Sequence, residues 1–472
     1  MKALTGQDAF FIYTETPEQH QHTVGVLILD PSTAPKGRFS IDKLIAKMSR
    51  DIDLLPEFRQ KLSKIPLALA PPTLVDDPHF NFSDHIETAA LAKPGSMEQL
   101  ATLVSEIASE PLDKNKPLWQ TWFISGLENG RIAVASKSHH CISDGAQGAE
   151  FMAQQFEFSP DAPEPKTADT AQLGWQPEKA NAFDIAFTGW QNQLKDRQGV
   201  KSMFDKTLRA INNRKALFED RNEAASLVPS LLPSAPKLAF NGAISARRKI
   251  AFGQLPLADV KAIKNHFGVK INDVVLCAVA LSLRDILISQ NDLPTEPLVI
   301  AIPVSLELQG QERGNKGNAN GNMMVKVPVH IADAKECLDF IHASTIEAKA
   351  VFEHTFEDLM NGYLSLLPPV IANRAMKSLF SKTAANIISS PTNLTVSNFP
   401  GPPIPLYMLG AKLEATFPVG PVINMQGLMT TFMSSMDSID FSCNACADKF
   451  PQVQALRDGI VDSVQQLKTL IN

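Results

Sequence analysis

The sequence predicts a mixed α/β protein of two domains, and three observations lead to this prediction. Its 472 residues exceed what one hydrophobic core usually holds. Short runs with strand character alternate with longer runs of helical spacing along both halves. Two proline-rich stretches, Ser159–Pro165 and Val228–Pro236, separate these halves. We therefore expect a first domain at 1–158, a linker with a helical segment at 159–236, and a second domain at 237–472.

The first half is expected to be a sheet with helices packed on it. Runs rich in Val and Ile predict buried strands, whereas apolar residues at every third or fourth position predict helices. Glu128–Gly130 would form the hairpin turn between the last two strands. The predicted strands are Thr23–Leu29, Trp119–Ser125 and Ile132–Ala135, and the predicted helices are Ile41–Ile52, Met97–Ala108, a start at Ala146–Ala153 and, in the linker, Phe183–Phe218.

The second half shows the same two patterns. Its predicted helices are Leu257–Asn265, Asn272–Ser289, Asp333–Phe352 and Gln452–Leu470. Its predicted strands are Leu298–Val304, Met323–Val329, Leu394–Ser397, Ala415–Val419, Leu428–Ser434 and Ile439–Asn444. The closing helix is amphipathic, so we expect it to cover one face of the second sheet.

The composition argues against several classes of protein. The formal net charge of −6 at pH 7 argues against nucleic acid as a partner. Five cysteines, an odd number in a long chain, give no disulfide framework. Cys443 and Cys446 have the spacing of a zinc or redox pair. No second ligand pair lies nearby in sequence, and Ile439–Ser442 alternates like a strand, so we expect two core cysteines.

No segment of the sequence is expected to cross a membrane. A membrane-spanning helix needs about 20 apolar residues, and the longest apolar run, Val274–Leu283, predicts a buried helix instead. The first residues lack the basic start and apolar run of a signal peptide. We expect a cytoplasmic protein, soluble or associated peripherally with a membrane or lipid droplet. Ala375–Ile388 and Phe183–Phe218 are candidate lipid contacts, and each is equally consistent with a helix packed on its own core.

The most informative motif is His139-His140-Cys141-Ile142-Ser143-Asp144-Gly145, which follows a predicted strand. A rigid strand end can aim an imidazole into a cleft, and histidine exchanges protons near neutral pH. Asp144 can fix the ring in one tautomer, directly or by shaping the loop. Gly145 permits positive φ and lets a substrate approach the backbone closely. The motif is therefore a candidate catalytic loop.

Two other interpretations of this loop stay open. A histidine pair at a strand end is often only a hydrogen-bonded structural feature, and Asp-Gly is a common turn. Two histidines and an aspartate could also ligate zinc, although adjacent residues on a strand point to opposite faces.

The spacing His-His, three residues, Asp-Gly resembles the signature of the CoA-dependent acyltransferase superfamily. Pro56–Leu62 and Pro111–Trp119, which precede it, resemble segments of bacterial wax ester synthase/diacylglycerol acyltransferases. Val269–Leu276 resembles the Asn-Asp motif of that family, and Ser397–Pro402 resembles its Asn-x-Pro-Gly-Pro motif. The blocks fall in the family's order across nearly the whole chain, so together they favour this family.

The resemblance implies two chloramphenicol-acetyltransferase-like domains, each a mixed sheet flanked by helices, with an active-site tunnel between them. A piece of the second domain would cross to the first domain's sheet. His140 would be the general base that deprotonates an alcohol, which then attacks acyl-CoA directly without an acyl-enzyme. His139 and Asp144 would hold the loop and the ring in place, with Gly145 completing the catalytic loop.

Further site residues are implied by the same resemblance. The residues that would support the site from the second domain are Asn272, Asp273, Ser397 and Asn398. The basic run Arg247-Arg248-Lys249 resembles one at this place in the family. Arg247 and Arg248 could grip CoA phosphates in bidentate fashion. The alternative for this run is a solvated strand edge.

The implied function is transfer of a fatty acyl group from acyl-CoA to a long-chain alcohol, giving a wax ester, or to diacylglycerol, giving triacylglycerol. The expected partners are acyl-CoA, the acceptor and a lipid surface or inclusion. No metal or redox cofactor is implied, since acyl-CoA is a substrate. One rival is a related acyltransferase that uses a carrier-bound donor. The other is a non-catalytic lipid-binding or lipid-droplet protein, against which the intact His140 and Asp144 count.

The sequence also departs from the family pattern. Cys141 replaces the alanine usual after the histidine pair, and Gln21–Gly25 matches the usual Pro-Met-His-Val-Gly only loosely. Thr430–Ser438 lacks the Tyr and Gly common there. Since this late strand could line an acyl or alcohol channel, the resemblance does not fix the chain length of the substrates.

Overall fold

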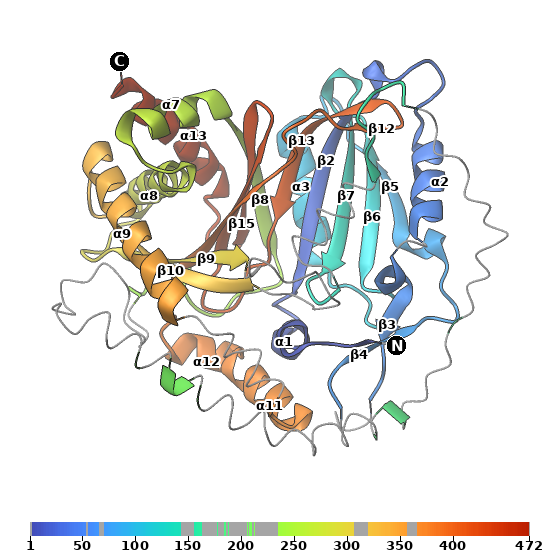
Figure 1. Cartoon of the computed structure of the whole chain (residues 1–472), viewed down its shortest axis with the longest axis horizontal. Coiled ribbons are helices and arrows are strands. Elements are labelled where there is room, and N and C mark those ends of the chain that lie inside the picture. Colours follow the sequence, from blue (N-terminus) through green and yellow to red (C-terminus); the bar gives the residue numbers. More distant parts are fainter. Residues whose placement is uncertain are drawn as a thin grey trace.

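The computed structural model contains two β-sheet halves that lie side by side, with helices packed against them (Figure 1). It describes residues 2–52, 55–65, 70–142, 155–162, 235–305, 320–355 and 366–471, with a few single positions between 177 and 212. Each half contains a six-stranded sheet with both parallel and antiparallel pairs. The mixed α/β fold class predicted from the sequence is therefore confirmed.

The first sheet has the strand order β12-β13-β2-β7-β6-β5. Its elements are β2 (His22–Asp30), β5 (Ile86–Ala90), β6 (Trp119–Ser125), β7 (Ile132–His139), β12 (Tyr407–Met408) and β13 (Ala411–Val419), covered by α2 (Ile41–Asp51) and α3 (Met97–Ser109). Successive residues of β2 point to opposite faces. Leu27 packs with Leu44 of α2, whereas Ile28 packs with Val104 of α3. The two helices thus lie on opposite faces of this sheet.

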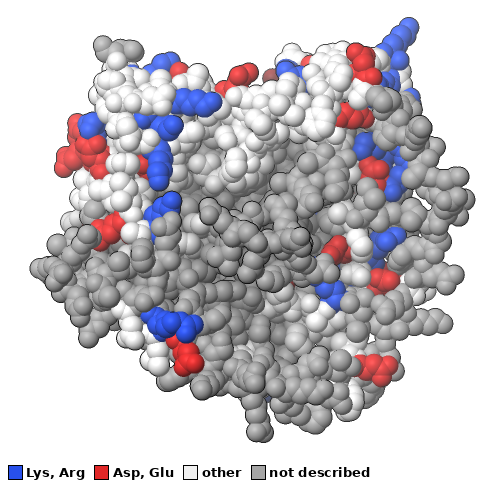
Figure 2. All heavy atoms as spheres, in the orientation of Figure 1, with Lys and Arg blue, Asp and Glu red and all other residues white. Residues whose placement is uncertain are grey.

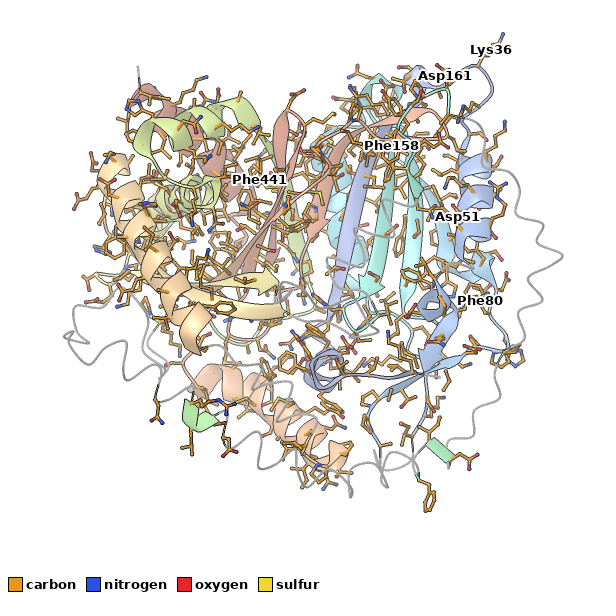
Figure 3. All side chains as sticks on the ribbon, viewed as in Figure 1. Lys36, Asp51, Phe80, Phe158, Asp161 and Phe441 are labelled. Carbon is orange, nitrogen blue, oxygen red and sulfur yellow. The ribbon has the colours of Figure 1, made fainter. Side chains whose placement is uncertain are left out.

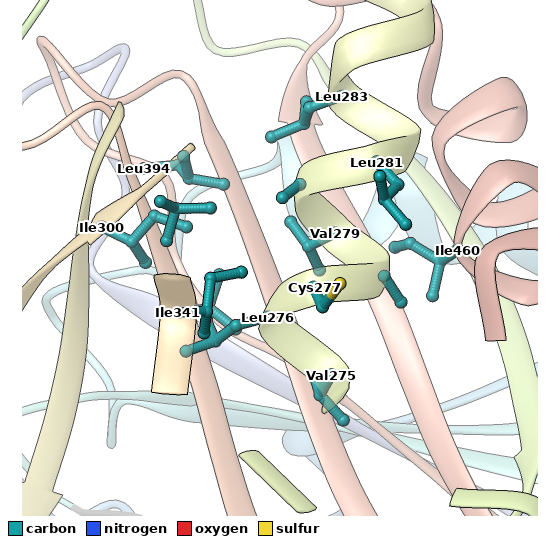
Figure 4. Close-up of a cluster of buried hydrophobic side chains, with 14 of the residues drawn as sticks. Val275, Leu276, Cys277, Val279, Leu281, Leu283, Ile300, Ile341, Leu394 and Ile460 are labelled. Atoms are coloured by element: carbon teal, nitrogen blue, oxygen red, sulfur yellow. The ribbon is translucent and has the colours of Figure 1, made fainter. Parts of the chain in front are cut away.

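The second sheet has the order β10-β9-β11-β14-β15-β8. Its strands are β8 (Arg248–Pro256), β9 (Leu298–Ser305), β10 (Asn320–Val327), β11 (Leu394–Pro400), β14 (Leu428–Ser435) and β15 (Ser438–Cys446), and its helices are α7 (Leu257–Phe267), α8 (Ile271–Ser289), α9 (Ala334–Thr355) and α13 (Val453–Thr469). Helix α8 runs through the core: Leu276, Val279 and Leu283 are completely buried (Figure 4). Phe441 lies inside the same half, where its ring stacks on Phe432 (Figure 3).

Side chains, rather than a shared ladder, join the two sheets where β13 meets β15. β13 comes from the second half of the chain but pairs antiparallel with β2, so the crossover implied by the resemblance is present (Figure 1). Alternate residues of β15 hydrogen-bond to the neighbouring backbone of β13 and the residue after it. Asp440 accepts from the Thr416 amide at 2.8 Å, and Asn444 donates to the Gly420 carbonyl at 2.7 Å.

Helix α3 covers the free edge of β8 in a similar way. The Ile250 amide donates to Ser105 Oγ at 2.9 Å, and the Arg248 amide donates to Ser109 Oγ at 2.8 Å. An uncovered edge strand exposes unpaired amides, so α3 closes the second sheet while it packs on the first.

The N-terminal helix α1 (Gly6–Thr14) was not predicted from the sequence. It lies between the lower ends of β2 and β7 and helix α11 (Pro369–Leu379), as Figure 1 shows. Thr5 caps it by accepting from the Asp8 amide at 3.1 Å. The other elements that were not predicted include β5, β12 and the three-stranded sheet of β1 (Lys2–Ala3), β4 (Thr73–Asp76) and β3 (Gln60–Leu62). Helices α11 and α12 (Lys382–Ile387) overlap Ala375–Ile388, which the sequence offered as a lipid contact or a packed helix.

Most predicted elements are present with shifted ends. β7 continues past Ala135 to His139, and β13 begins at Ala411 rather than Ala415. The predicted start at Ala146–Ala153 and most of Phe183–Phe218 lie outside the described residues. Within the described ranges, no helix is both long and apolar enough to cross a membrane.

Candidate active site

The histidine pair lies at the end of β7, and its backbone is fixed on both sides. The His139 amide donates to the Leu118 carbonyl at 2.9 Å, and the His140 amide donates to the Gln21 carbonyl at 2.8 Å. The Ile142 amide closes a tight turn on the His139 carbonyl at 3.1 Å. The chain therefore leaves the sheet at His140 from a rigid strand end, as the sequence predicted.

His139 is a buried residue whose ring has one defined tautomer when neutral. Its Nδ1 accepts the Cys141 amide at 3.1 Å, so the proton sits on Nε2. That Nε2 is 3.6 Å from Oε2 of Glu15, and Lys114 Nζ is 2.5 Å from the same oxygen. Glu15 follows α1 directly, and Lys114 belongs to the Pro111–Trp119 block.

The Glu15 carboxylate is ionised in spite of its burial. Burial raises its pKa, but the contacts with His139 and Lys114 outweigh that effect, so its pKa lies below the usual value. A negative charge therefore stands beside the first histidine of the pair, in a place that the sequence motif did not indicate.

His140 is half-buried and stacks on an aromatic ring. The centroids of the His140 and Phe11 rings are 4.1 Å apart, and the ring planes are 13° from parallel. Phe10 meets Phe11 edge to face with centroids 5.8 Å apart, and it also meets Phe380 at 5.5 Å. The second histidine thus lies against α1, and α1 lies against the end of α11.

Cys141 is a buried thiol next to the pair. Burial raises its pKa well above the usual value, and the nearby Asp8 and Glu15 act in the same direction. Since the thiolate is the nucleophilic form, this cysteine is a poor candidate for a covalent acyl carrier.

Two buried basic residues stand behind the pair. Lys137, 1% exposed, donates from Nζ to the Ile107 carbonyl at 2.9 Å and the Glu110 carbonyl at 3.0 Å, and burial lowers its pKa to about 8. His22 lies opposite His139 in the sheet, and its Nε2 is 3.0 Å from the Ala108 carbonyl. Burial, with Lys137 nearby, holds the pKa of His22 well below its usual range, so it is neutral.

The two upstream sequence blocks meet beside this strand end. Trp119 Nε1 donates to the Phe58 carbonyl at 2.7 Å, which joins Pro111–Trp119 to Pro56–Leu62. Leu118 of the same block accepts the His139 amide. These two blocks, which resemble the family in sequence, therefore pack beside the strand end that carries the histidine pair.

Comparison with known proteins assigns this arrangement to a family. Residues 4–275 match the family model of the wax ester synthase/diacylglycerol acyltransferase catalytic domain, and residues 316–468 match that of the WS/DGAT C-terminal domain. The chain belongs to the wax ester synthase/diacylglycerol acyltransferase family. It is therefore an acyltransferase of this family.

Individual relatives cover almost the whole chain. A Mycobacterium tuberculosis H37Rv protein named as a candidate diacylglycerol O-acyltransferase is 33% identical over 470 residues, which are 99% of this chain and 90% of that protein. The structure of a wax ester synthase/diacylglycerol acyltransferase from Marinobacter aquaeolei VT8 has a TM-score of 0.67 at 24% identity and covers 99% of both chains. A trichothecene 15-O-acetyltransferase from Fusarium sporotrichioides has a TM-score of 0.60 at 14% identity, over 99% of this chain and 94% of that one. The two structures show that the fold is that of the CoA-dependent acyltransferases.

Part of the predicted catalytic loop lies outside the described residues. Asp144 and Gly145 belong to the range 143–154 that the structure does not describe, so their positions relative to His140 stay predictions. Among the described residues, no group of three or more His, Cys, Asp or Glu is arranged to hold a metal ion. The zinc interpretation involves Asp144, so it is not tested by this finding.

The family's Asn-Asp motif lies at the start of α8. Asp273 is 1% exposed, and its carboxylate accepts from Thr345 Oγ1 at 2.8 Å and lies 2.7 Å from Nδ1 of His342. It also accepts the Lys270 amide at 2.9 Å, so it caps α8 and ties it to α9. These contacts give Asp273 a structural role in the second half, and Asn272 next to it is half-buried.

Ser397 and Asn398 lie on β11 and are both half-buried. Successive strand residues face opposite sides. Ser397 pairs with Thr431 of β14, on the face that carries Ser442 of β15, whose hydroxyl donates to the Pro418 carbonyl at β13. Ser397 is thus on the face toward the first half, whereas Asn398 is on the other face.

The predicted CoA-binding arginines have different environments. Arg247 is exposed and pairs with Asp448 at 2.9 Å. Arg248 is not part of an exposed patch: it is 6% exposed, and its guanidinium donates to the carbonyls of Ser245 at 2.5 Å and Glu18 at 2.7 Å. Burial lowers its pKa to about 10. Its role in the structure is to join the start of β8 to the loop after α1.

Sequence reasoning missed Phe11 and Glu15, whose side chains lie against the pair, and Lys114, which binds Glu15. Phe11 and Glu15 lie on or directly after a nine-residue helix that shows no strong apolar stripe. Lys114 lies inside Pro111–Trp119, a block that resembles the family, and this resemblance was the only indication in the sequence that Lys114 belongs to the site. The partners themselves could not be paired without the fold.

Proposed function

We propose that this protein transfers a fatty acyl group from acyl-CoA to the hydroxyl of a long-chain alcohol or diacylglycerol, with His140 as general base. Membership of the family supports the reaction class. The observation that favours His140 as the base is its position at the rigid end of β7, with its ring stacked on Phe11 and its neighbour His139 placed 3.6 Å from the Glu15 carboxylate.

The proposed reaction is a single displacement. The imidazole of His140 takes the proton of the acceptor hydroxyl while the oxygen attacks the thioester carbonyl. The carbon–sulfur bond then breaks, CoA leaves as the thiolate, and the protonated His140 returns the proton to sulfur. The ester and free CoA are the products, and no acyl-enzyme forms, in keeping with the protonated thiol of Cys141. The reaction as proposed needs no metal or redox cofactor.

The remaining site residues have supporting roles in this proposal. Asp144 and Gly145 shape the loop after His140, and Ser397 lies along the path of the acyl chain or the alcohol. Arg247 contacts CoA phosphates from the start of β8. Asn272 and Asp273 act from a distance, by keeping α8 in place.

An assay of the purified protein tests the proposal. Palmitoyl-CoA is offered with alcohols of increasing length and with diacylglycerol, while free CoA and product lipid are followed together. Ester formation that matches CoA release one to one is expected. Transfer only from an acylated carrier protein would favour the carrier-dependent rival. Lipid binding without any ester product would favour the non-catalytic one.

A further inference from the structure

We propose that helix α1 and the residue after it are part of the active site, with Phe11 positioning the ring of His140 and Glu15 positioning that of His139. This inference rests on the proposed role of His140 as the base. Neither residue belongs to the His-His-Asp-Gly motif, and both act through a histidine rather than on the substrate.

Phe11 restricts the orientation of the His140 ring. The terminal torsion of histidine is broad, so a strand end alone does not fix the plane of the imidazole. A parallel ring at 4.1 Å covers one face of His140, so the imidazole plane follows the plane of the Phe11 ring. A catalytic side chain has to be held within about 10–20° of its productive geometry. The Phe11 ring supplies this restraint.

Phe11 is itself in contact with a second aromatic ring. Phe10 contacts it edge to face and bridges to Phe380, which caps α11. Helix α1 packs along α11, so three aromatic rings in series connect His140 to that helix. A leucine at position 11 would fill much of the space but would not offer a flat face.

Glu15 holds the other histidine through its charge. The Cys141 amide leaves only Nε2 of His139 to carry the ring proton, and this nitrogen faces the Glu15 carboxylate. Lys114 binds the same oxygen and keeps the carboxylate in place. A rotated His139 would release the Cys141 amide and loosen the turn that begins at His140.

The loop after Glu15 connects back to the pair. Gln21 accepts the His140 amide through its carbonyl, and its side chain donates to Thr14 Oγ1 at 2.9 Å. Gln19 donates to the Thr14 carbonyl at 2.7 Å. The segment from Phe11 to Gln21 therefore contacts the ring of His140, its amide and the ring of His139, three restraints on one pair.

A matched variant elsewhere in the chain controls the test of Phe11. Phe11→Leu removes the stacked ring, whereas Phe267→Leu is the same change at a half-buried phenylalanine of α7, in the second half. We expect Phe11→Leu to lower kcat by about 10- to 100-fold, the scale of a misplaced catalytic group. KM for donor and acceptor should stay within about twofold, and Phe11→Tyr, which keeps the ring, should recover most of the activity. Phe267→Leu should keep a near-normal kcat.

An NMR measurement tests the contact between Phe11 and His140 without relying on enzyme activity. The Phe11 ring current should shift the His140 ring-proton resonance, assigned with His140→Gln in histidine-labelled protein. Phe11→Leu should remove this shift, and Phe267→Leu should keep it. If the wild type does not transfer acyl groups, the proposed function is refuted. The His140 resonance would still show whether the Phe11 ring stacks on His140. An unchanged resonance in Phe11→Leu, an unchanged kcat in an active enzyme, or an equal loss in Phe267→Leu would overturn the positioning role.

Glu15 is tested in parallel against Glu18. Glu15→Gln removes the charge beside His139, and Glu18→Gln removes a charge from the same loop that pairs with Lys382 at 2.7 Å. The Glu15 variant should lose about tenfold or more in kcat with little change in KM, and Glu15→Asp should recover part of it. Equal kcat values for Glu15→Gln and Glu18→Gln would show that the carboxylate does not position the pair.

Discussion

Lys137 shows what burial does to a single charged residue near this site. Its ammonium group donates to two carbonyls at the end of α3 and lies 5.0 Å from the centroid of the Trp122 ring. The end of a helix favours a positive charge, but burial opposes it more strongly and lowers the pKa to about 8. The lysine therefore caps α3 only two residues before His139.

This depressed pKa predicts a pH dependence of stability. Between pH of about 8 and the unfolded value of about 10.4, the unfolded chain binds a proton that the folded protein lacks. Folding stability from this group therefore rises as pH rises through that window. The Tm of the wild type minus that of Lys137→Met should increase from pH 7.5 to pH 10. A flat or falling difference would mean that Lys137 keeps its proton in the fold.

Alanine substitutions of Arg247 and Arg248 should have different effects on stability and on acyl-CoA binding. Arg248→Ala is expected to lower the free energy of unfolding by about 1–3 kcal/mol or more, because it leaves buried carbonyls without donors. Arg247→Ala should leave stability nearly unchanged, since its side chain is 75% exposed. It should raise KM for acyl-CoA more than KM for the alcohol, with a smaller effect at high salt. Unchanged KM values would move the CoA site elsewhere.

At the scale of elements, α3 is the piece that closes the second sheet. Ser105→Ala would leave the buried amide of Ile250 without an acceptor, at a cost of about 1–3 kcal/mol in the free energy of unfolding. Thr102→Ala on the same helix is the control, since that hydroxyl is exposed and bonds only to the Glu98 carbonyl of its own turn. Urea unfolding of both variants measures the difference. Equal losses would deny the edge-capping role.

Elements with a strong local pattern could be predicted, and contacts across the fold could not. The apolar run of α8 and the Val-Ile strand of β7 carry their structure in their own sequence. Helix α1 has nine residues and depends on packing against α11, so its pattern was too weak to identify it. Arg248 is buried where its guanidinium donates to the Glu18 carbonyl, and Glu18 is distant from it in sequence. A basic run alone could not reveal that contact.

At the scale of the whole molecule, the site is assembled from distant parts of the chain. The strand β13 that completes the first sheet comes from residues after 410, and only the resemblance to a family indicated this crossover. The histidine pair was visible in the motif, but its supports come from α1, from the Lys114 block and, through Phe10 and Phe380, from α11. Charged side chains of both signs lie on both halves of the face in Figure 2, in keeping with the small net charge.

The outer surface of α11 and α12 predicts lipid contact. Ile371, Leu379 and Ile387 are exposed at 53%, 42% and 76%, and the exposed Lys377 lies among them. Apolar and basic side chains together suit an anionic membrane surface. We expect flotation with anionic liposomes, and Ile371→Glu with Ile387→Glu should weaken it strongly. Ile288→Glu, at an exposed isoleucine of α8, should not. Equal flotation of all variants would place the contact elsewhere.

The general base is the central claim, and His140→Ala tests it most directly. With palmitoyl-CoA and the best acceptor, this variant should lose on the order of 10²- to 10⁴-fold in kcat. Its Tm should stay near that of the wild type, because the half-buried ring lies at the end of β7 rather than in the core. A folded His140→Ala protein with near-normal turnover would contradict the account.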